Sequence, residues 1–206
     1  YTSNKATLGD IRYKDLNGDG IINNQDVAPI GYPNFPAYHY SMKVGFNYKG
    51  FDLKLLFTGT ANGSFYVGSG MSMPYYKYAG NAWQWMYDGR WTPEKVAAGE
   101  KITYPRASFN PTTSDNNYLG VSSDYWMYSN DFIKLKNAEI GYTFPSGSKF
   151  LKKANIASLR LYLNGNNLIT FKNEMKEMGI DPETADGTSY IYPLTRVFNI
   201  GVNIQF

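Results

Sequence analysis

The fold is decided by the stretch Arg196-Val197-Phe198-Asn199-Ile200-Gly201-Val202-Asn203-Ile204-Gln205-Phe206. Every even-numbered residue from 198 to 206 is apolar, whereas the odd-numbered ones are mostly polar or glycine. A period of two is that of a β-strand with one apolar face. That face would meet a core in a soluble sandwich and lipid in a membrane barrel, and this strand alone leaves both open. The chain stops on an aromatic residue with no polar tail, which favours the barrel because the termini of soluble domains are usually solvated.

Composition narrows the class of protein. The 206 residues are 43% hydrophobic, and 19 Tyr and 12 Phe raise the aromatic share to 17%, which suits a β-protein, a membrane girdle or a sugar-binding surface. The mean hydropathy is −0.43. The sequence contains no run of about 18 apolar residues, so it predicts no membrane-spanning helix. A net charge of +3 on scattered Lys and Arg gives nucleic-acid binding little support.

Two further features concern the cell compartment. The chain has no Cys, so disulfides are absent and the compartment is left open. Residues 1–5 are polar and unlike an apolar targeting core. If the protein is exported, we therefore expect this sequence to be a fragment or a processed piece.

Residues 38–48 form the clearest predicted strand. Six aromatic or apolar residues at even positions, beginning and ending with Tyr, alternate with mostly polar ones. Aromatic, apolar, aromatic is the order of a barrel strand with its two girdles. Lys49-Gly50 predicts a tight turn, and residues 51–57 resume the alternation as the return strand. His39, the only His, is expected on the polar face as a solvated side chain.

A second hairpin is predicted over residues 132–145 and 159–171. Ile133 and Leu135 share one parity, whereas Ala138, Ile140 and Tyr142 share the other. A single β-bulge near Lys136-Asn137 would place both sets on one face. With the closing strand, the chain is predicted to be all-β, with about five antiparallel up-and-down strands.

The connections between these strands alternate in length. Residues 9–36, 60–124 and 172–190 form long connections, and residues 49–50 and 145–155 form short ones. Outer-membrane barrels have long extracellular loops and short periplasmic turns. We therefore expect the long segments to be extracellular and the short ones periplasmic.

The strongest local motif lies in the first long segment. Oxygen-bearing side chains stand at positions one, three, five, nine and twelve of a loop whose position six is Gly20, and position seven offers a backbone carbonyl. A hard cation such as calcium prefers this oxygen set. The alternative is an Asx- and Gly-rich turn without metal. The predicted calcium ligands, in a structural role, are Asp15, Asn17, Asp19, Ile21, Asn23 and Asp26.

The long segment 60–124 is rich in aromatic residues, which could stack on sugar rings or dock a partner. The alternative is that they pack the loop on itself. Within it, Thr92 is expected to cap a short helical turn that begins at Pro93. The candidate substrate- or partner-binding residues are Trp83, Trp85, Trp91, Tyr75, Tyr76 and Tyr78.

Several of these segments resemble one family. Residues 9–22 (GDIRYKDLNGDGII), 132–137 (FIKLKN) and 141–145 (GYTFP) are similar to segments of SusC/RagA-type TonB-linked outer-membrane transporters. The tail of the chain resembles that family in Asn166-Asn167-Leu168, Asp181-Pro182-Glu183, Tyr192-Pro193 and the terminal Phe206. The resemblance covers essentially the whole chain.

The resemblance implies a plugged barrel of about 22 strands in the cell outer membrane, of which residues 1–206 supply the C-terminal part. It further implies import of oligosaccharides or peptides, powered by TonB through an N-terminal part absent from this sequence, beneath a SusD-like lipoprotein lid. By the same resemblance, Phe206 is expected to be the signal read by the barrel assembly machinery. The substrate itself is beyond the sequence.

Two other classes of protein are alternatives to the importer. No nucleophile–base pair is recognisable, and the paired carboxylates lie in the calcium-type loop, so we expect no enzymatic chemistry and no glycoside hydrolase. The alternative is a secreted soluble β-sandwich that binds carbohydrate and holds structural calcium. That alternative requires one dry interior shared by Tyr40, Val44, Leu53, Ile140, Leu161 and Ile200.

Overall fold

The computed structural model describes residues 7–67, 82–107, 123–184 and 192–206. Its strands are β1 (Tyr38–Tyr48), β2 (Phe51–Ala61), β3 (Ser64–Tyr66), β4 (Met127–Ser129), β5 (Phe132–Thr143), β6 (Ser158–Lys172) and β7 (Val197–Gln205). Short helical segments are α2 (Gln84–Gly89), α3 (Pro93–Ala97), η3 (Asp124–Trp126), α4 (Lys149–Lys153), η4 (Lys176–Met178) and η5 (Pro182–Thr184). Within the described residues, no helix is long and apolar enough to cross a membrane.

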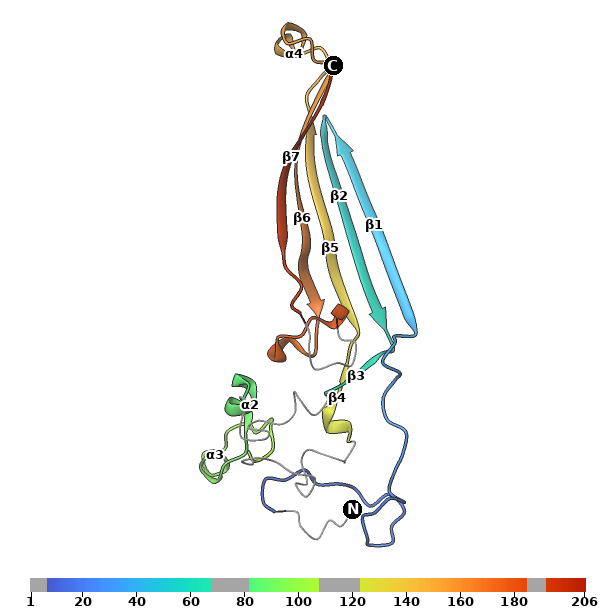
Figure 1. Ribbon diagram of the computed structural model, residues 1–206, viewed down its shortest axis with the longest axis vertical. Coiled ribbons are helices and arrows are strands. Elements are labelled where there is room, and N and C mark those ends of the chain that lie inside the picture. Colours follow the sequence, from blue (N-terminus) through green and yellow to red (C-terminus); the bar gives the residue numbers. More distant parts are fainter. Residues whose placement is uncertain (1–6, 68–81, 108–122, 185–191) are drawn as a thin grey trace.

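The five long strands form one antiparallel sheet in the order β1-β2-β5-β6-β7. Each long strand therefore pairs with the long strand that precedes or follows it in the chain, which is the predicted up-and-down arrangement. The all-β prediction is confirmed. The short turns and residue 206 lie at one end of the sheet, and the long connections lie at the other (Figure 1). The chain gathers most of its irregular structure at that second end, where β3 and β4 form a separate two-stranded sheet.

The register of the sheet aligns one apolar face across all five strands. Phe46, Leu53, Ile140, Leu163 and Ile200 form one such row of cross-strand partners. The adjoining row towards the short turns is Tyr48, Phe51, Tyr142, Leu161 and Val202. Period-two alternation has thus produced a continuous apolar surface opposite a polar one.

The predicted bulge in β5 is confirmed. Leu56 pairs with Asn137 and Phe57 pairs with Leu135, so Lys136 is the extra residue. The insertion reverses the parity of the strand, which brings Leu135 and Ala138 onto the same face of the sheet.

The soluble sandwich is not supported, because the apolar face has no dry interior. Tyr40, Val44, Ile140 and Leu161 are 43–49% exposed and Ile200 is 85% exposed. Leu53 is half-buried. The buried hydrophobic cluster lies instead among the long connections, and its members are Phe65, Val67, Met86, Tyr104, Trp126, Met175, Met178 and Ile180. The apolar face of the sheet therefore has no protein layer over it within the described residues.

Candidate functional site: the polar face and its loop cluster

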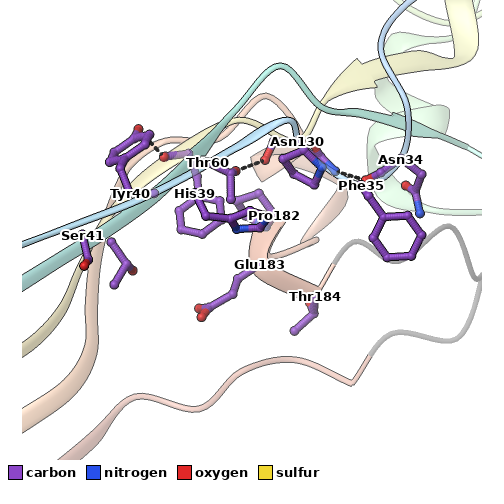
Figure 2. A pocket seen from close by; sticks show the side chains of 14 residues that line it. Asn34, Phe35, His39, Tyr40, Ser41, Thr60, Asn130, Pro182, Glu183 and Thr184 are labelled. Atoms are coloured by element: carbon purple, nitrogen blue, oxygen red, sulfur yellow. Dashed lines mark hydrogen bonds between the residues drawn. The ribbon is translucent and has the colours of Figure 1, made fainter.

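A pocket of about 720 Å³ opens where the polar face of β1, β2 and β5 meets the long connections. Figure 2 shows His39, Ser41 and Thr60 on the strands facing Pro182, Glu183 and Thr184 of η5. The other lining residues are Asn34, Phe35, Pro36, Tyr40, Thr58, Gly59, Asn130 and Phe132. Sequence reasoning placed His39 on the polar face but missed the pocket, because its walls come from segments more than a hundred residues apart.

Hydrogen bonds fix the strand ends that form this pocket. The Thr60 hydroxyl donates to the Asn130 carbonyl at 3.1 Å, and the Asn130 amide donates to the Asn34 carbonyl at 3.0 Å (Figure 2). On β1, the Tyr40 hydroxyl donates to the Phe132 carbonyl at 3.0 Å. Its ring lies over Gly59, where a Cβ would come within 2.4 Å of the ring. Because Gly59 has no side chain, the Tyr40 ring of β1 can cross β2 and reach the Phe132 carbonyl of β5.

A charged cluster lies beside the pocket. Lys134 of β5 is 1% exposed, and its Nζ lies 2.7 and 2.8 Å from the two Asp181 carboxylate oxygens and 2.9 Å from Glu183 Oε2. Lys136 Nζ lies 2.6 Å from Glu183 Oε1. Both lysines precede the point where the bulge changes the strand's parity, so they share the polar face. We call Lys134, Lys136, Asp181 and Glu183 the lysine clasp.

The lysine clasp fixes the last long connection to the sheet wall. Burial alone would raise the pKa of Glu183, but hydrogen bonds and charge from Lys136 and Lys134 outweigh it and hold the pKa below its ordinary value. The segment between β6 and the clasp is tied down again by Met175, Met178 and Ile180, which are buried in the loop core. Residues 173–184 of this connection therefore form a fixed part of the pocket wall.

A second charged cluster lies on the polar face near the short turns. Arg160 of β6 forms two bonds to Asp52 of β2, at 2.9 and 2.5 Å, and one to Glu139 of β5 at 2.7 Å. Lys54 lies 3.2 Å from Glu139. Gly141 makes room for this cluster, because a Cβ there would lie 2.4 Å from Arg160 Nη2. The polar face is thus lined with paired charges over much of its length.

The predicted aromatic binding residues have different surroundings. Trp85 packs against the loop core, with its ring edge-on to Tyr104 at 5.5 Å. Trp91 covers Gly9, where a Cβ would lie 2.5 Å from its indole ring. Trp83 is 47% exposed and is free to contact a partner. Tyr75, Tyr76 and Tyr78 lie outside the described residues.

Trp126 is the one tryptophan of the four that sequence reasoning did not single out. It is 1% exposed, and its ring lies 5.9 Å from that of Tyr104 at the centre of the loop core. Its neighbours come from several long connections, so no local pattern marks it. Locally, the expected helical turn is confirmed: the Thr92 hydroxyl accepts a hydrogen bond from Lys95 N at 3.3 Å, and α3 begins at Pro93.

In the calcium-type loop, residues 15–26, side-chain carboxylates accept hydrogen bonds from backbone N–H groups of the same loop. Asp15 accepts from Gly18 N at 2.6 Å and from Gly20 N at 2.7 Å. Asp26 accepts from Asn23 N and Leu16 N, each at 2.8 Å, and these bonds lower its pKa. Keeping Asp26 ionised suits a cation ligand.

The donor chemistry of this loop fits a hard cation, whereas its present arrangement is not a gathered metal site. Asp19 accepts from Ile21 N at 2.7 Å, and the Ile21 carbonyl accepts weakly from Asn23 Nδ2 at 3.4 Å. Across the described ranges, no three Asp, Glu or His side chains form a group able to hold a metal ion. The carboxylates are thus engaged by backbone N–H groups of the loop.

Comparison of the sequence with curated proteins gives three matches that share one description. The chain is 28% identical over 94% of its length to TonB-dependent receptor P3 of Formosa agariphila. It is 27% identical over 97% of its length to TonB-dependent receptor P26 of the same organism. No family model matches the chain.

Solved structures give the same fold. The chain superposes on the RagAB peptide transporter with a TM-score of 0.63 over 90% of its length, at 19% identity. The open-open state of the RagAB peptide importer gives a TM-score of 0.58 over 85% of the chain, at 18% identity. The chain is therefore similar to a segment of TonB-dependent receptors and has the fold of the corresponding part of the RagAB transporter. The chain spans about a fifth of the length of these relatives, namely 19% of receptor P3 and 19% of the RagAB chain.

The likeness to TonB-dependent receptors accounts for the exposed apolar face. TonB-dependent transporters are outer-membrane barrels, so the outer membrane is the location of this segment. In such a barrel, hydrocarbon would cover the row of Phe46, Leu53, Ile140, Leu163 and Ile200, and the polar face with its pocket would look into the interior. The comparisons bear out the resemblance that the sequence motifs indicated, and the register confirms the apolar and polar faces.

Proposed function

We propose that the parent transporter imports an oligosaccharide or a peptide across the outer membrane, and that this chain forms the C-terminal part of its barrel wall. The observation that supports this function most strongly is the strand register. It aligns apolar side chains on one face of five strands and paired charges on the other. A lipid-facing exterior around a polar interior is the arrangement that a plugged import barrel needs.

The pocket and the loop cluster support a binding role at one end of this wall. His39, Ser41, Thr60 and Glu183 present polar atoms to a volume of about 720 Å³, which is within the range of a small-molecule site. The ordered loops beside it offer a surface for a SusD-like lipoprotein lid, on the extracellular side expected for the long connections. TonB would act through parts of the transporter that this chain does not contain.

Uptake in cells tests this proposal. Cells that carry the parent gene should accumulate labelled oligosaccharides or labelled peptides, and cells without the gene or without TonB should not. Supplying the two substrate classes separately decides between them. Equal accumulation of both classes with and without the gene would remove the import function.

Trp83 is the described tryptophan with the most accessible ring. If it contacts substrate or lid, Trp83→Ala should weaken that binding by more than about 1 kcal/mol, as removal of an aromatic contact does. Val96→Ala is the control, because Val96 is 52% exposed on the neighbouring α3. Titration of the purified transporter with lid or substrate measures both, and equal affinities would leave Trp83 as a surface residue.

We further propose that residues 15–26 hold a structural calcium ion. Asp15, Asn17, Asp19, Asn23 and Asp26 would provide side-chain oxygens and Ile21 its carbonyl, and the ion would replace the loop's weaker internal bonds. Calcium should then raise the melting temperature of the parent transporter, and chelator should reverse the rise. The double variant Asp15→Ala, Asp19→Ala should abolish the difference, whereas a difference that persists in the variant would place the ion elsewhere.

A further inference from the structure

The short turn between β5 and β6 carries a compact basic helix. Lys149, Lys152 and Lys153 are exposed, and residues 145–158 contain no Asp or Glu. On a helix, positions i, i+3 and i+4 share one face, so the three ammonium groups point the same way. Leu151 stands on the opposite side and is fully buried. The lysine face is therefore turned away from the protein.

Backbone bonds hold this helix in place. Ile156 N donates to the Leu151 carbonyl at 3.0 Å, and Ala157 N donates to the Gln205 carbonyl at 2.7 Å. Ser148 Oγ donates to the Pro145 carbonyl at 2.6 Å. The turn is thus closed on itself and fastened to the end of β7, so the lysines are presented by an ordered support.

A chain of aromatic rings shows which side of the sheet the helix lies on. Phe51 and Tyr142 belong to the apolar face, with ring centroids 4.6 Å apart. Tyr142 contacts Phe144 at 5.1 Å, and Phe144 contacts Phe150 of α4 at 5.5 Å. Phe150 is itself 50% exposed. The rings lead without a break from the lipid-facing surface to the basic helix, which lies beyond the strand ends in Figure 1.

We propose that α4 binds the headgroup of an anionic phospholipid. Like charges three and four residues apart repel one another, and a phosphodiester at the membrane surface would offset that repulsion. Aromatic rings at the level of the headgroups with basic side chains beyond them match the chemistry of such a lipid, whose phosphate is charged and whose tails are apolar. The short turns of outer-membrane barrels face the periplasm, so α4 would meet lipid headgroups at the periplasmic surface of the membrane.

The inference rests on the outer-membrane location and the apolar face, and it is independent of which nutrient the transporter imports. It names a lipid contact of the barrel wall, whereas the proposed function concerns the interior. An uptake assay that fails would therefore leave it standing, and a lipid assay that fails would leave the import proposal standing.

Native mass spectrometry of the purified full-length transporter tests the proposal. The probes are phosphatidylglycerol and phosphatidylcholine, which share tails and differ in headgroup charge. Wild type should retain phosphatidylglycerol in preference, and the triple variant Lys149→Gln, Lys152→Gln, Lys153→Gln should lose that preference. Attraction of on the order of fivefold per lysine near an anionic surface implies a loss on the order of a hundredfold for the three together.

A matched triple variant controls for net charge. Lys14→Gln, Lys101→Gln, Lys176→Gln removes the same charge from exposed lysines among the long connections, and it should retain the wild-type preference. Phe150→Ala should weaken retention of both lipids. Raising the ionic strength should reduce the wild-type preference, which tests the electrostatic origin even if a variant fails to assemble. Equal retention of the two lipids by wild type, or an unchanged preference in the α4 variant, would overturn the proposal.

Discussion

Leu163→Arg should destabilise the barrel by about 2–4 kcal/mol, which is the cost of a cation on the lipid face near the bilayer midplane. Leu163 lies midway along β6 on the apolar face, between Ile140 and Ile200, and it is 46% exposed. In the outer membrane that exposed surface meets hydrocarbon, in which a guanidinium has neither water nor a counterion. Urea unfolding of the parent transporter refolded into lipid vesicles measures the difference.

Asn164→Arg is the matched control one residue away. Asn164 stands on the polar face opposite Glu139, and it accepts one hydrogen bond from Asn199 Nδ2 at 2.9 Å. The new cation would have water and a carboxylate nearby, so the cost should stay near that of the lost hydrogen bond, about 1 kcal/mol. Similar losses for the two variants would contradict the assignment of lipid and interior to the two faces.

Lys134→Met should release the connection between β6 and β7 from the sheet. The substitution leaves Asp181 and Glu183 facing each other with Lys136 as their remaining cation in the lysine clasp. Breaking a buried ion pair costs about 3–5 kcal/mol, and we expect the lower value because the carboxylates are 21% and 30% exposed. A loss of about 3 kcal/mol corresponds to roughly a hundredfold faster amide exchange over residues 173–184.

Hydrogen exchange of the purified transporter measures this release, with Lys176→Met as control. Lys176 is exposed on η4 in the same connection and has no ion pair within the described part of the chain. Its replacement should leave exchange unchanged. Unaltered protection in Lys134→Met would show that Met175, Met178 and Ile180 hold the connection without the lysine clasp.

The lysine clasp should also depend on pH. The folded-state pKa of Glu183 is lowered, so its contribution is fully present above the unfolded value of about 4.3 and is lost as pH falls through the lowered value. Exchange of residues 173–184, corrected for its intrinsic pH dependence, should therefore stay constant from neutral pH to about 5 and accelerate in more acidic solution. Lys134→Met should reduce this acid-dependent change without abolishing it, because Lys136 still pairs with Glu183. A wild-type change centred near neutral pH would point to another group.

The sequence by itself determined the five strands, their order and the two faces. Alternation is a local property, since successive side chains of a strand point to opposite sides wherever the strand lies. The parity break in residues 132–145 located the bulge near Lys136-Asn137, and the Thr92-Pro93 pair located the start of α3. These features depend on residues close together in the sequence, so they could be predicted without knowledge of the tertiary structure.

Only the tertiary structure decided where the buried core and the pocket lie. Trp126, Met86 and Met178 meet in the loop core, and Lys134 meets Asp181 across 47 residues. Such contacts depend on how the long connections fold back over the end of the sheet, and neither period nor spacing encodes that path. The sequence showed that Trp85 and Trp83 were aromatic residues in one loop, whereas burial against Tyr104 or exposure to solvent was set by packing between distant segments.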